Sequence, residues 1–245
     1  MGRGGREPDG MIVVAVETST PRTSVAIATE REIVGSVSIA GRARQEAVTP
    51  ALAQLLEWTG VRLGQVGGIA AGIGPGLFTG LRVGVQTAKT LAQVLTVPIV
   101  GITSLDALAF SVRHTHKLIV TVIDGRRGEV FYAIYRSLPG GVVRGHDYAV
   151  ATPDHLCAEL ETIPGDMLAV GDGAILYREQ LDQLGSRVEI ASAIRAHPEA
   201  AALAELAIPR MVREEYDRLH DVAPLYLRRS DAEIAWDRRD RHVGA

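Results

Sequence analysis

The chain has 245 residues, of which 47% are hydrophobic and 4% aromatic, and its formal net charge is -3. This length is sufficient for one large domain or two small ones with a sizeable core. The small net charge excludes a global electrostatic attraction to nucleic acid. The single cysteine, Cys157, excludes an intramolecular disulfide, and no apolar run approaches the ~20 residues of a membrane helix. Residues 1–10 are polar and rich in glycine, so we expect a flexible lead-in there and not a signal peptide.

The first elements of the chain are strands. Two β-branched runs around a polar turn predict a hairpin over residues 11–29, and a third strand follows at 32–40. A helix is then expected over 49–59, with Pro50 in its first turn and Gly60 as its stop.

A second strand–helix alternation follows. Residues 66–74 predict a buried strand, and Thr79 is expected to be the N-cap of the next helix. The apolar positions of that helix step by four and three: Leu81, Val85, Ala88, Ala92 and Leu95. Another strand is predicted at 97–103, followed by a short helix at 104–113. This alternation is typical of an α/β protein.

The pattern then begins again about a hundred residues along. Residues 118–135 repeat the strand–turn–strand layout of the first hairpin, and an acidic residue ends each first strand, Glu17 and Asp124. A restart of this kind indicates two similar α/β units. The second unit is degenerate, with a helix at 152–160, a strand and turn at 167–174, and a long helix at 197–219 that Pro209 kinks or breaks.

The predicted division of the chain follows from this repeat. We expect an N-terminal lobe over 11–110, a degenerate C-terminal lobe over 111–224, and a tail over 225–245 that can pack back on the N-terminal lobe.

The stretch GIGPGLFTGLRVG, residues 72–84, raises the question of a phosphate site. It matches neither the P-loop nor the dinucleotide fingerprint, since Leu77 stands where the third glycine of the latter should be. An anion site at the N-terminus of the helix stays open, with Arg82 nearby. We favour an interface, because Gly84 and Ala88 let another backbone approach and Phe78 is a residue type common in contact surfaces.

The two acidic hairpins form a second candidate site. In folds that clamp ATP between two lobes, each lobe offers such a turn to the phosphates or their metal. The nucleotide-binding candidates are Glu17, Thr18, Ser19, Asp124 and Gly125, with the turn Gly171, Asp172 and Gly173 on the adenosine side. The competing explanation is two ordinary polar turns.

Other catalytic or metal sites are not indicated. His114 and His116 would share one face of a strand, but no third ligand lies nearby in sequence, so a solvated pair is favoured. Cys157 lies in an apolar helix and is expected to be a core residue. We therefore predict neither catalytic residues nor metal ligands.

Four stretches, in this order and spacing, resemble the TsaB (YeaZ) family: VETSTPRTSVAIA, GIAAGIGPGLFTGLRVGVQTAKTLAQVLTVPIVGITSLDALA, VIDGRRGEVFYAIY and VGDGA. The resemblance covers residues 11–175 and thins toward the tail apart from PLYLRR. Where the family commonly has His-Ser-Glu, this chain has Arg44-Gln45-Glu46. The resemblance implies the duplicated ribonuclease H-like fold of actin, Hsp70 and sugar kinases, with two lobes.

The resemblance also implies a function in tRNA modification. Members of the family are subunits required for threonylcarbamoylation of N6 of adenosine 37 in tRNAs reading codons that begin with A. They act as dimerisation and activation partners of TsaD, the catalytic paralogue. TsaD carries an H-x-x-x-H metal pair, and Ser104 and Leu108 stand at the matching positions here. A hydroxyl and a leucine cannot hold a divalent metal, so the resemblance implies a non-catalytic subunit.

The implied partners are TsaD, the ATPase subunit TsaE and a second copy of the chain, with tRNA reached only through the complex. No cofactor is implied with certainty, although the complex can use ATP or ADP, and the expected location is the cytoplasm. The expected interface residues lie on two helices: Leu52, Leu56, Leu77, Phe78, Leu81, Arg82, Gly84, Val85 and Ala88. The alternative is an ATP-binding kinase or carbamoyl transferase that acts alone.

Overall fold

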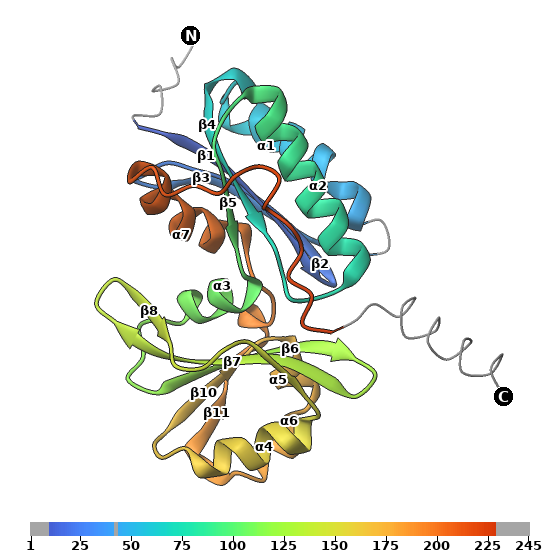
Figure 1. The fold of residues 1–245 in the computed structure, drawn as a ribbon, viewed down its shortest axis with the longest axis vertical. Coiled ribbons are helices and arrows are strands. Elements are labelled where there is room, and N and C mark those ends of the chain that lie inside the picture. Colours follow the sequence, from blue (N-terminus) through green and yellow to red (C-terminus); the bar gives the residue numbers. More distant parts are fainter. Residues whose placement is uncertain (1–9, 42–43, 229–245) are drawn as a thin grey trace, which may run out of the picture.

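The computed structural model describes residues 10–41 and 44–228, which form two lobes stacked along the long axis of the molecule (Figure 1). The expected lead-in and most of the expected tail lie outside the described residues.

The first lobe is built on a five-stranded sheet in the order β3-β2-β1-β4-β5. The first three strands are antiparallel neighbours, whereas β1, β4 and β5 run parallel. The strands are β1 Ile12–Thr20, β2 Arg22–Ala28, β3 Ile33–Ala40, β4 Val66–Gly72 and β5 Ile99–Ile102.

Helices cover both faces of this sheet, so β1 is buried on both sides. Val14 and Val16 pack with α1 (Val48–Thr59) and α2 (Phe78–Leu95), while Val13 and Ala15 pack with α7 (Ala200–Val212). Successive side chains of a strand point to opposite faces, so a continuous β-branched run supplies both cores.

The second lobe repeats the topology of the first. Its sheet has the order β11-β10-β6-β7-β8, with β9 pairing with β7 at the same edge. Again two antiparallel pairs lead to two parallel ones, with β6 in the place of β1. The strands are β6 Leu118–Arg126, β7 Glu129–Leu138, β8 Gly141–Arg144, β9 Ala149–Ala151, β10 Met167–Val170 and β11 Val188–Ile190. The predicted duplication is confirmed by this strand order.

Shorter helices complete the second lobe and join it to the first. They are α3 Ser104–Ser111, α4 Pro153–Thr162, α5 Asp172–Leu176 and α6 Arg178–Asp182, with the 3-10 turns η3 Gly185–Arg187 and η4 Ala193–Arg195. The 3-10 turns η1 Arg44–Ala47 and η2 Leu63–Gln65 flank α1 in the first lobe. Helix α3 lies between the two sheets (Figure 1).

Three local predictions need correction. Helix α2 begins at Phe78 with Leu77 as its N-cap, so Thr79 is not the cap. The helix expected over 197–219 is shorter, since α7 ends at Val212, three residues after Pro209. His114 and His116 lie in the loop between α3 and β6 and not on a strand.

The lobes also divide differently from the expected residue ranges. A boundary at residue 110 assigns α7 to the second lobe, whereas α7 packs on the first sheet through Ala200, Leu203 and Ala207. The described end of the chain, residues 213–228, runs back along the first lobe (Figure 1).

Candidate functional site

The glycine-rich loop and the start of α2 lie directly on the turn of the first hairpin. A Cβ atom at Gly76 would be 2.2 Å from the Ser19 carbonyl oxygen, and one at Gly84 would be 2.0 Å from Thr18 Oγ1. The Leu77 amide donates to the Ser19 carbonyl at 2.6 Å, and Thr18 Oγ1 donates to the Gly80 carbonyl at 2.7 Å. The glycines therefore allow close packing within the chain, and the loop does not form an open phosphate cradle.

Glu17 belongs to a closed network beneath the same turn. Its carboxylate accepts hydrogen bonds from the Ser19 amide at 2.6 Å and from Ser104 Oγ at 2.9 Å, and its side chain is 1% exposed. Burial raises the pKa of Glu17, while the bonds from Ser19 and Ser104 oppose the rise. Gly72 is required beside it, because a Cβ atom there would lie 2.3 Å from the carboxylate.

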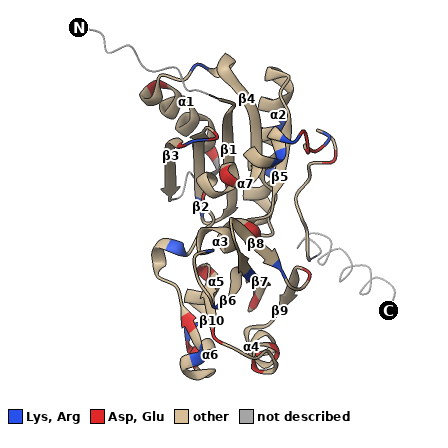
Figure 2. Cartoon of the chain, turned by 90° about the vertical axis from the view of Figure 1, so that its left-hand side faces the viewer, with Lys and Arg blue, Asp and Glu red and all other residues tan. Residues whose placement is uncertain are grey.

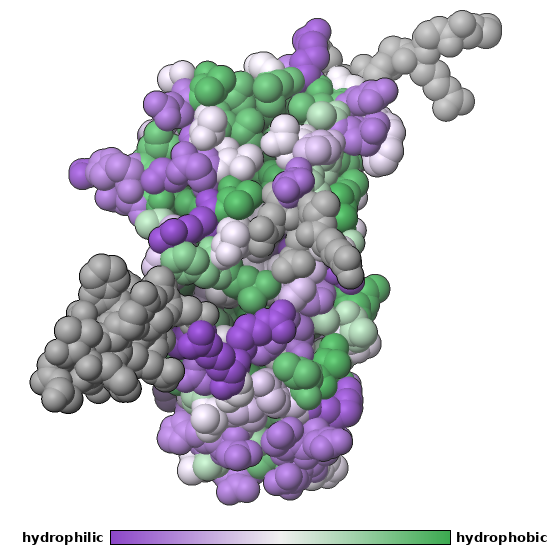
Figure 3. Space-filling model, turned by 90° about the vertical axis from the view of Figure 1, so that its right-hand side faces the viewer, coloured by the Kyte–Doolittle hydropathy of each residue, from purple (hydrophilic) through white to green (hydrophobic). Residues whose placement is uncertain are grey.

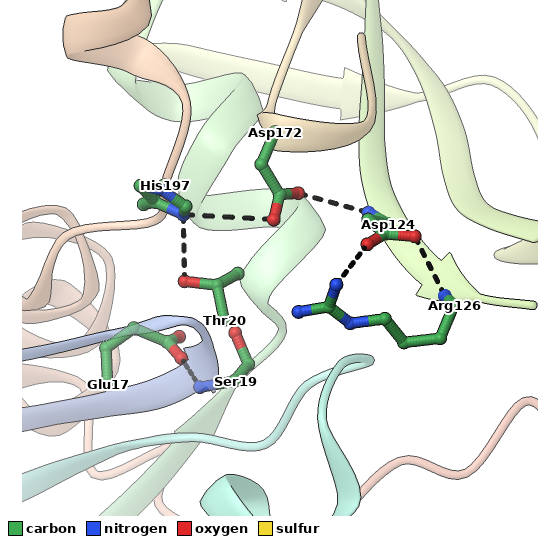
Figure 4. Close-up of polar contacts among 7 residues, drawn as sticks. All are labelled: Glu17, Ser19, Thr20, Asp124, Arg126, Asp172 and His197. Atoms are coloured by element: carbon green, nitrogen blue, oxygen red, sulfur yellow. Dashed lines mark hydrogen bonds and ion pairs between the residues drawn. The ribbon is translucent and has the colours of Figure 1, made fainter. Parts of the chain in front are cut away.

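The second acidic residue belongs to a different cluster, at the junction of the lobes (Figure 4). Asp124 Oδ1 accepts from the Arg126 amide at 2.8 Å, and its Oδ2 lies 3.1 Å from the Arg126 guanidinium. Asp172 accepts from the Asp124 amide at 3.0 Å. His197 Nδ1 lies 3.1 Å from Thr20 Oγ1 and 4.0 Å from Asp172 Oδ2. This cluster connects the ends of β1 and β6 through the turn after β10.

The charges in the cluster are set by burial. Burial raises the pKa of Asp172 to about 6, with the charge of Asp124 adding to the rise. Burial lowers the pKa of His197 to about 4, and the Arg22 guanidinium contributes in the same direction. The imidazole is therefore neutral at neutral pH, and its approach to Asp172 is not an ion pair.

The predicted nucleotide residues are brought near one another but are not open to a ligand. All but Asp172 are buried, and the glycines of the third turn rest on β6, where a Cβ atom at Gly171 would lie 2.1 Å from the Val122 carbonyl oxygen. The cavity beside Asp124 and Gly125 has a volume of about 130 Å³. Ligand pockets usually measure about 300–1,000 Å³. The residues present therefore do not fit a bound nucleotide.

The end of the described chain fills this region. The Leu225 amide donates to the Ile73 carbonyl at 2.7 Å, Leu227 packs on the core of the second sheet, and Arg228 pairs with Glu129. Lys89 Nζ donates to the Val222 carbonyl at 2.9 Å. Residues 222–228 thus bridge α2 and the loop after β4 of the first lobe to the β6–β7 hairpin of the second.

The predicted interface residues separate into two groups. Leu52, Leu81, Gly84, Val85 and Ala88 are buried within the chain itself. Their assignment to a surface is wrong, because their small or apolar face packs on the first sheet. Leu56, Leu77 and Phe78 are partly buried, and Arg82 is exposed.

Phe78 and Arg82 form a surface cluster with a residue that sequence reasoning did not single out, Tyr226. The Phe78 and Tyr226 rings lie 5.1 Å apart, the Arg82 guanidinium stacks 3.9 Å from the Phe78 ring, and Arg82 Nε donates to Tyr226 Oη at 3.3 Å. The stretch PLYLRR was noticed only as part of a resemblance, and nothing local in it indicates contact with α2. The contact between Thr20 and His197 could not be predicted from local sequence either, because 177 positions separate the two residues.

Ser104 and Leu108 have structural roles. Ser104 is the donor to Glu17, and Leu108 is fully buried in the core between α3 and the second sheet. Within residues 10–41 and 44–228, no group of three or more His, Cys, Asp or Glu side chains is placed to hold a metal ion. In the same ranges, no helix is long and apolar enough to cross a membrane.

Two lobes with the same strand order, joined at the ends of their first strands, define a duplicated ribonuclease H-like α/β fold. The model of one family, described as TsaD: tRNA N6-adenosine threonylcarbamoyltransferase, matches residues 36–236, and the chain belongs to this family.

The curated relatives carry the name that the sequence motifs predict. The chain is 29% identical to the tRNA threonylcarbamoyladenosine biosynthesis protein TsaB of Bacillus subtilis, over 92% of this chain and 98% of that protein. It is 24% identical to TsaB of Escherichia coli, over 92% and 97%. The solved structure of YeaZ from Pseudomonas aeruginosa matches with a TM-score of 0.76 at 27% identity, over 89% of this chain and 100% of that one. The predicted resemblance to TsaB (YeaZ) is confirmed.

Proposed function

We propose that this chain is a non-catalytic subunit in the biosynthesis of threonylcarbamoyladenosine in tRNA, where it binds and activates the catalytic paralogue TsaD. Membership in the transferase family and the names of the curated relatives support the pathway. The non-catalytic role rests on Ser104 and Leu108. They stand where the resemblance places the metal-binding histidines of TsaD, and neither side chain is available to bind a metal.

These two positions do not fit a metal. The Ser104 hydroxyl is committed to Glu17 at 2.9 Å, and Leu108 is 0% exposed in an apolar core. A divalent metal needs imidazole, thiolate or carboxylate ligands, which neither side chain supplies. This chain therefore contributes the scaffold of the family without the metal pair.

The alternative, an enzyme that binds ATP between its lobes, is disfavoured by the filled junction. The cavity of about 130 Å³ beside Asp124 is too small for a nucleotide, and residues 225–228 line it. An enzyme of this kind would need the tail segment to leave the junction before each binding event.

We assign the docking of the partner to the surface formed by α2 and residues 222–226, here called the α2–tail face. It presents Phe78, Arg82 and Tyr226 beside an open hollow of about 680 Å³ lined by Val83 and Pro224 among others. On this side of the molecule, apolar surface is more extensive over the first lobe than over the second (Figure 3). Tyrosine and arginine at the centre of a partly apolar face are common binding hot spots.

The same face serves self-association in the proposal, so that a second copy of the chain and TsaD compete for it. The ATPase subunit TsaE joins the resulting complex, tRNA is the substrate of the complex, and the expected location is the cytoplasm.

The test is reconstitution. Threonylcarbamoyl transfer to tRNA is measured with TsaD from the same organism, with and without this chain, and the complex is followed by analytical ultracentrifugation. We expect transfer only when TsaD is present, with strong stimulation by this chain. Transfer by this chain alone would refute the non-catalytic role.

A charge-reversal variant tests the docking face. Arg82→Glu should weaken the affinity for TsaD by about tenfold or more, because a carboxylate replaces a stacked guanidinium in the contact. The matched control is Arg178→Glu, at an exposed position on α6 in the other lobe. Equal affinities for the two variants would show that the partner docks elsewhere.

A further inference from the structure

A hollow with unusual charge lies at the edge of the second sheet that is opposite the β6–β7 turn. It is formed by the loop between α3 and β6, residues 113–118, and by the end of β7 with the following turn, residues 136–139, and its volume is about 650 Å³. We call it the basic hollow. The helix α3 and the strands β7 and β8 meet here (Figure 2).

Every ionisable side chain that lines the basic hollow is Arg, Lys or His: Arg113, His114, His116, Lys117 and Arg136. No Asp or Glu lines it. Elsewhere on this side of the molecule, basic and acidic positions are mixed in both lobes (Figure 2), and the whole chain has a net charge of -3. The positive lining is therefore a local feature.

The cations of the basic hollow can turn to a ligand at small cost. Arg113 pairs with Glu205 at 3.2 Å and Lys117 with Glu189 at 2.8 Å, but both carboxylates are well exposed, at 44% and 61%. Exposed pairs of this kind contribute little to stability. Arg136 is exposed, and none of the described residues forms an ion pair with it.

A hydrogen-bond donor in the basic hollow also lacks a partner. Ser137 lines it, and the Ser137 hydroxyl oxygen is buried without a hydrogen-bond partner among the described residues. Buried hydroxyls are normally hydrogen-bonded. An anion with several acceptor oxygens would pair with the cations, and it reaches the Ser137 hydroxyl only if that side chain rotates into the hollow. A metal ion bound through His114 and His116 would instead meet three like charges from Arg113, Lys117 and Arg136.

We propose that the basic hollow binds phosphate groups of an RNA backbone. This inference rests on the proposed function, which makes tRNA the substrate of the complex, and adds a direct contact to it. A chain of phosphates suits the geometry, because the cations are spread over two segments around an open space. A single phosphate is usually held in a closed cradle of backbone amides.

The experiment measures binding of a fluorescently labelled tRNA transcript to the isolated full chain by anisotropy, from low to moderate salt. Phosphate contacts make the logarithm of the association constant fall linearly with the logarithm of salt concentration. We expect Arg136→Gln to weaken binding and to reduce this slope by about one. The matched control is Arg218→Gln, which removes the same charge at an exposed position on the first lobe and should leave the slope unchanged.

Two competition arms identify the ligand. Inorganic pyrophosphate should compete only at concentrations far above those of unlabelled tRNA, whereas equal competition would assign the hollow to a free phosphate compound. An acidic peptide that displaces tRNA as well as unlabelled tRNA does would assign it to a protein partner.

Absence of tRNA binding at low salt, or equal slopes for Arg136→Gln and wild type, overturns the inference. Its failure is distinguishable from failure of the proposed function. If Arg136→Gln binds tRNA normally while TsaD is still stimulated, only the basic hollow is wrongly assigned. If Arg136→Gln loses tRNA binding while TsaD is not stimulated by the wild-type chain, the site stands and the proposed function does not.

Discussion

Replacing Gly84 by alanine places a methyl group where α2 rests on the first hairpin. The added Cβ atom would lie 2.0 Å from Thr18 Oγ1, so one of the two elements must move. Thr18 Oγ1 donates to the Gly80 carbonyl at 2.7 Å, and both Thr18 and Gly84 are buried. The clash therefore also breaks a buried hydrogen bond.

The magnitude follows from three contributions. Overpacking a close contact costs about 1–3 kcal/mol. Leaving a buried donor or acceptor unsatisfied costs about 1–3 kcal/mol. Alanine recovers about 1 kcal/mol of helix propensity relative to glycine. We expect the free energy of unfolding of Gly84→Ala to fall by about 1–5 kcal/mol.

The assay is equilibrium unfolding in urea, with Gly64→Ala as the control, since a Cβ atom at Gly64 meets nothing within 4 Å. A double-mutant cycle localises the cause. Thr18→Ala removes Oγ1 and leaves Thr18 Cβ, at 3.1 Å, as the closest side-chain atom. In that background Gly84→Ala should cost much less, so the coupling energy should make up most of the loss of about 1–5 kcal/mol expected in wild type. An equal loss in both backgrounds would refute the proposed contact.

Three further predictions follow from the junction and the α2–tail face. Because burial raises the pKa of Asp172 from 3.8 to about 6, the folded protein binds that proton more tightly than the unfolded chain, and this carboxyl lowers stability as pH rises between these values. The stability of Asp172→Asn relative to wild type, measured by urea unfolding, should therefore increase between pH of about 4 and 7, by at most about 3 kcal/mol. The control is Asp147→Asn, at an exposed residue. An equal gain in the two variants would contradict the assignment. Ser104→Ala leaves the buried Glu17 carboxylate without one donor and should cost about 1–3 kcal/mol of unfolding free energy, measured against Ser111→Ala, whose hydroxyl bonds only to its own helix. Tyr226→Ala should weaken TsaD binding by calorimetry while changing stability by only about 0.5–1.5 kcal/mol, and Tyr216→Ala, at a similarly exposed residue, should change neither; a stability loss without an affinity loss would limit Tyr226 to a structural role.

The strands could be predicted from sequence because their evidence is local. The β-branched runs of β1 and β6 and the polar turns after them are visible in single windows, and so is their repetition. The helices were less certain at their ends. Thr79 has the chemistry of an N-cap. The start of α2 is instead fixed by the Leu77 amide, which donates a hydrogen bond to the Ser19 carbonyl, a contact between segments far apart in the chain.

The burial of Leu81, Gly84, Val85 and Ala88, all predicted as interface residues, was missed for a related reason. Gly80, Gly84 and Ala88 form a stripe of small residues on α2, and such a stripe permits close approach by any backbone. The sequence shows that something approaches closely but not whether it belongs to the same chain. Here it is the turn of β1–β2, so the stripe faces inward and the opposite side of α2, with Phe78 and Arg82, faces solvent.

The segment 222–228 contributes both to the junction between the lobes and to the α2–tail face. Tyr226 stacks on α2, while its neighbours Leu225 and Leu227 contact the first and second lobes, respectively. A change in the angle between the lobes would therefore pull on the same short segment that completes the α2–tail face. The junction is filled by the chain's own residues, which contact both lobes. In the proposed docking, the contacts of Leu225 and Leu227 hold Tyr226 in place before the partner binds, which lowers the entropic cost of docking.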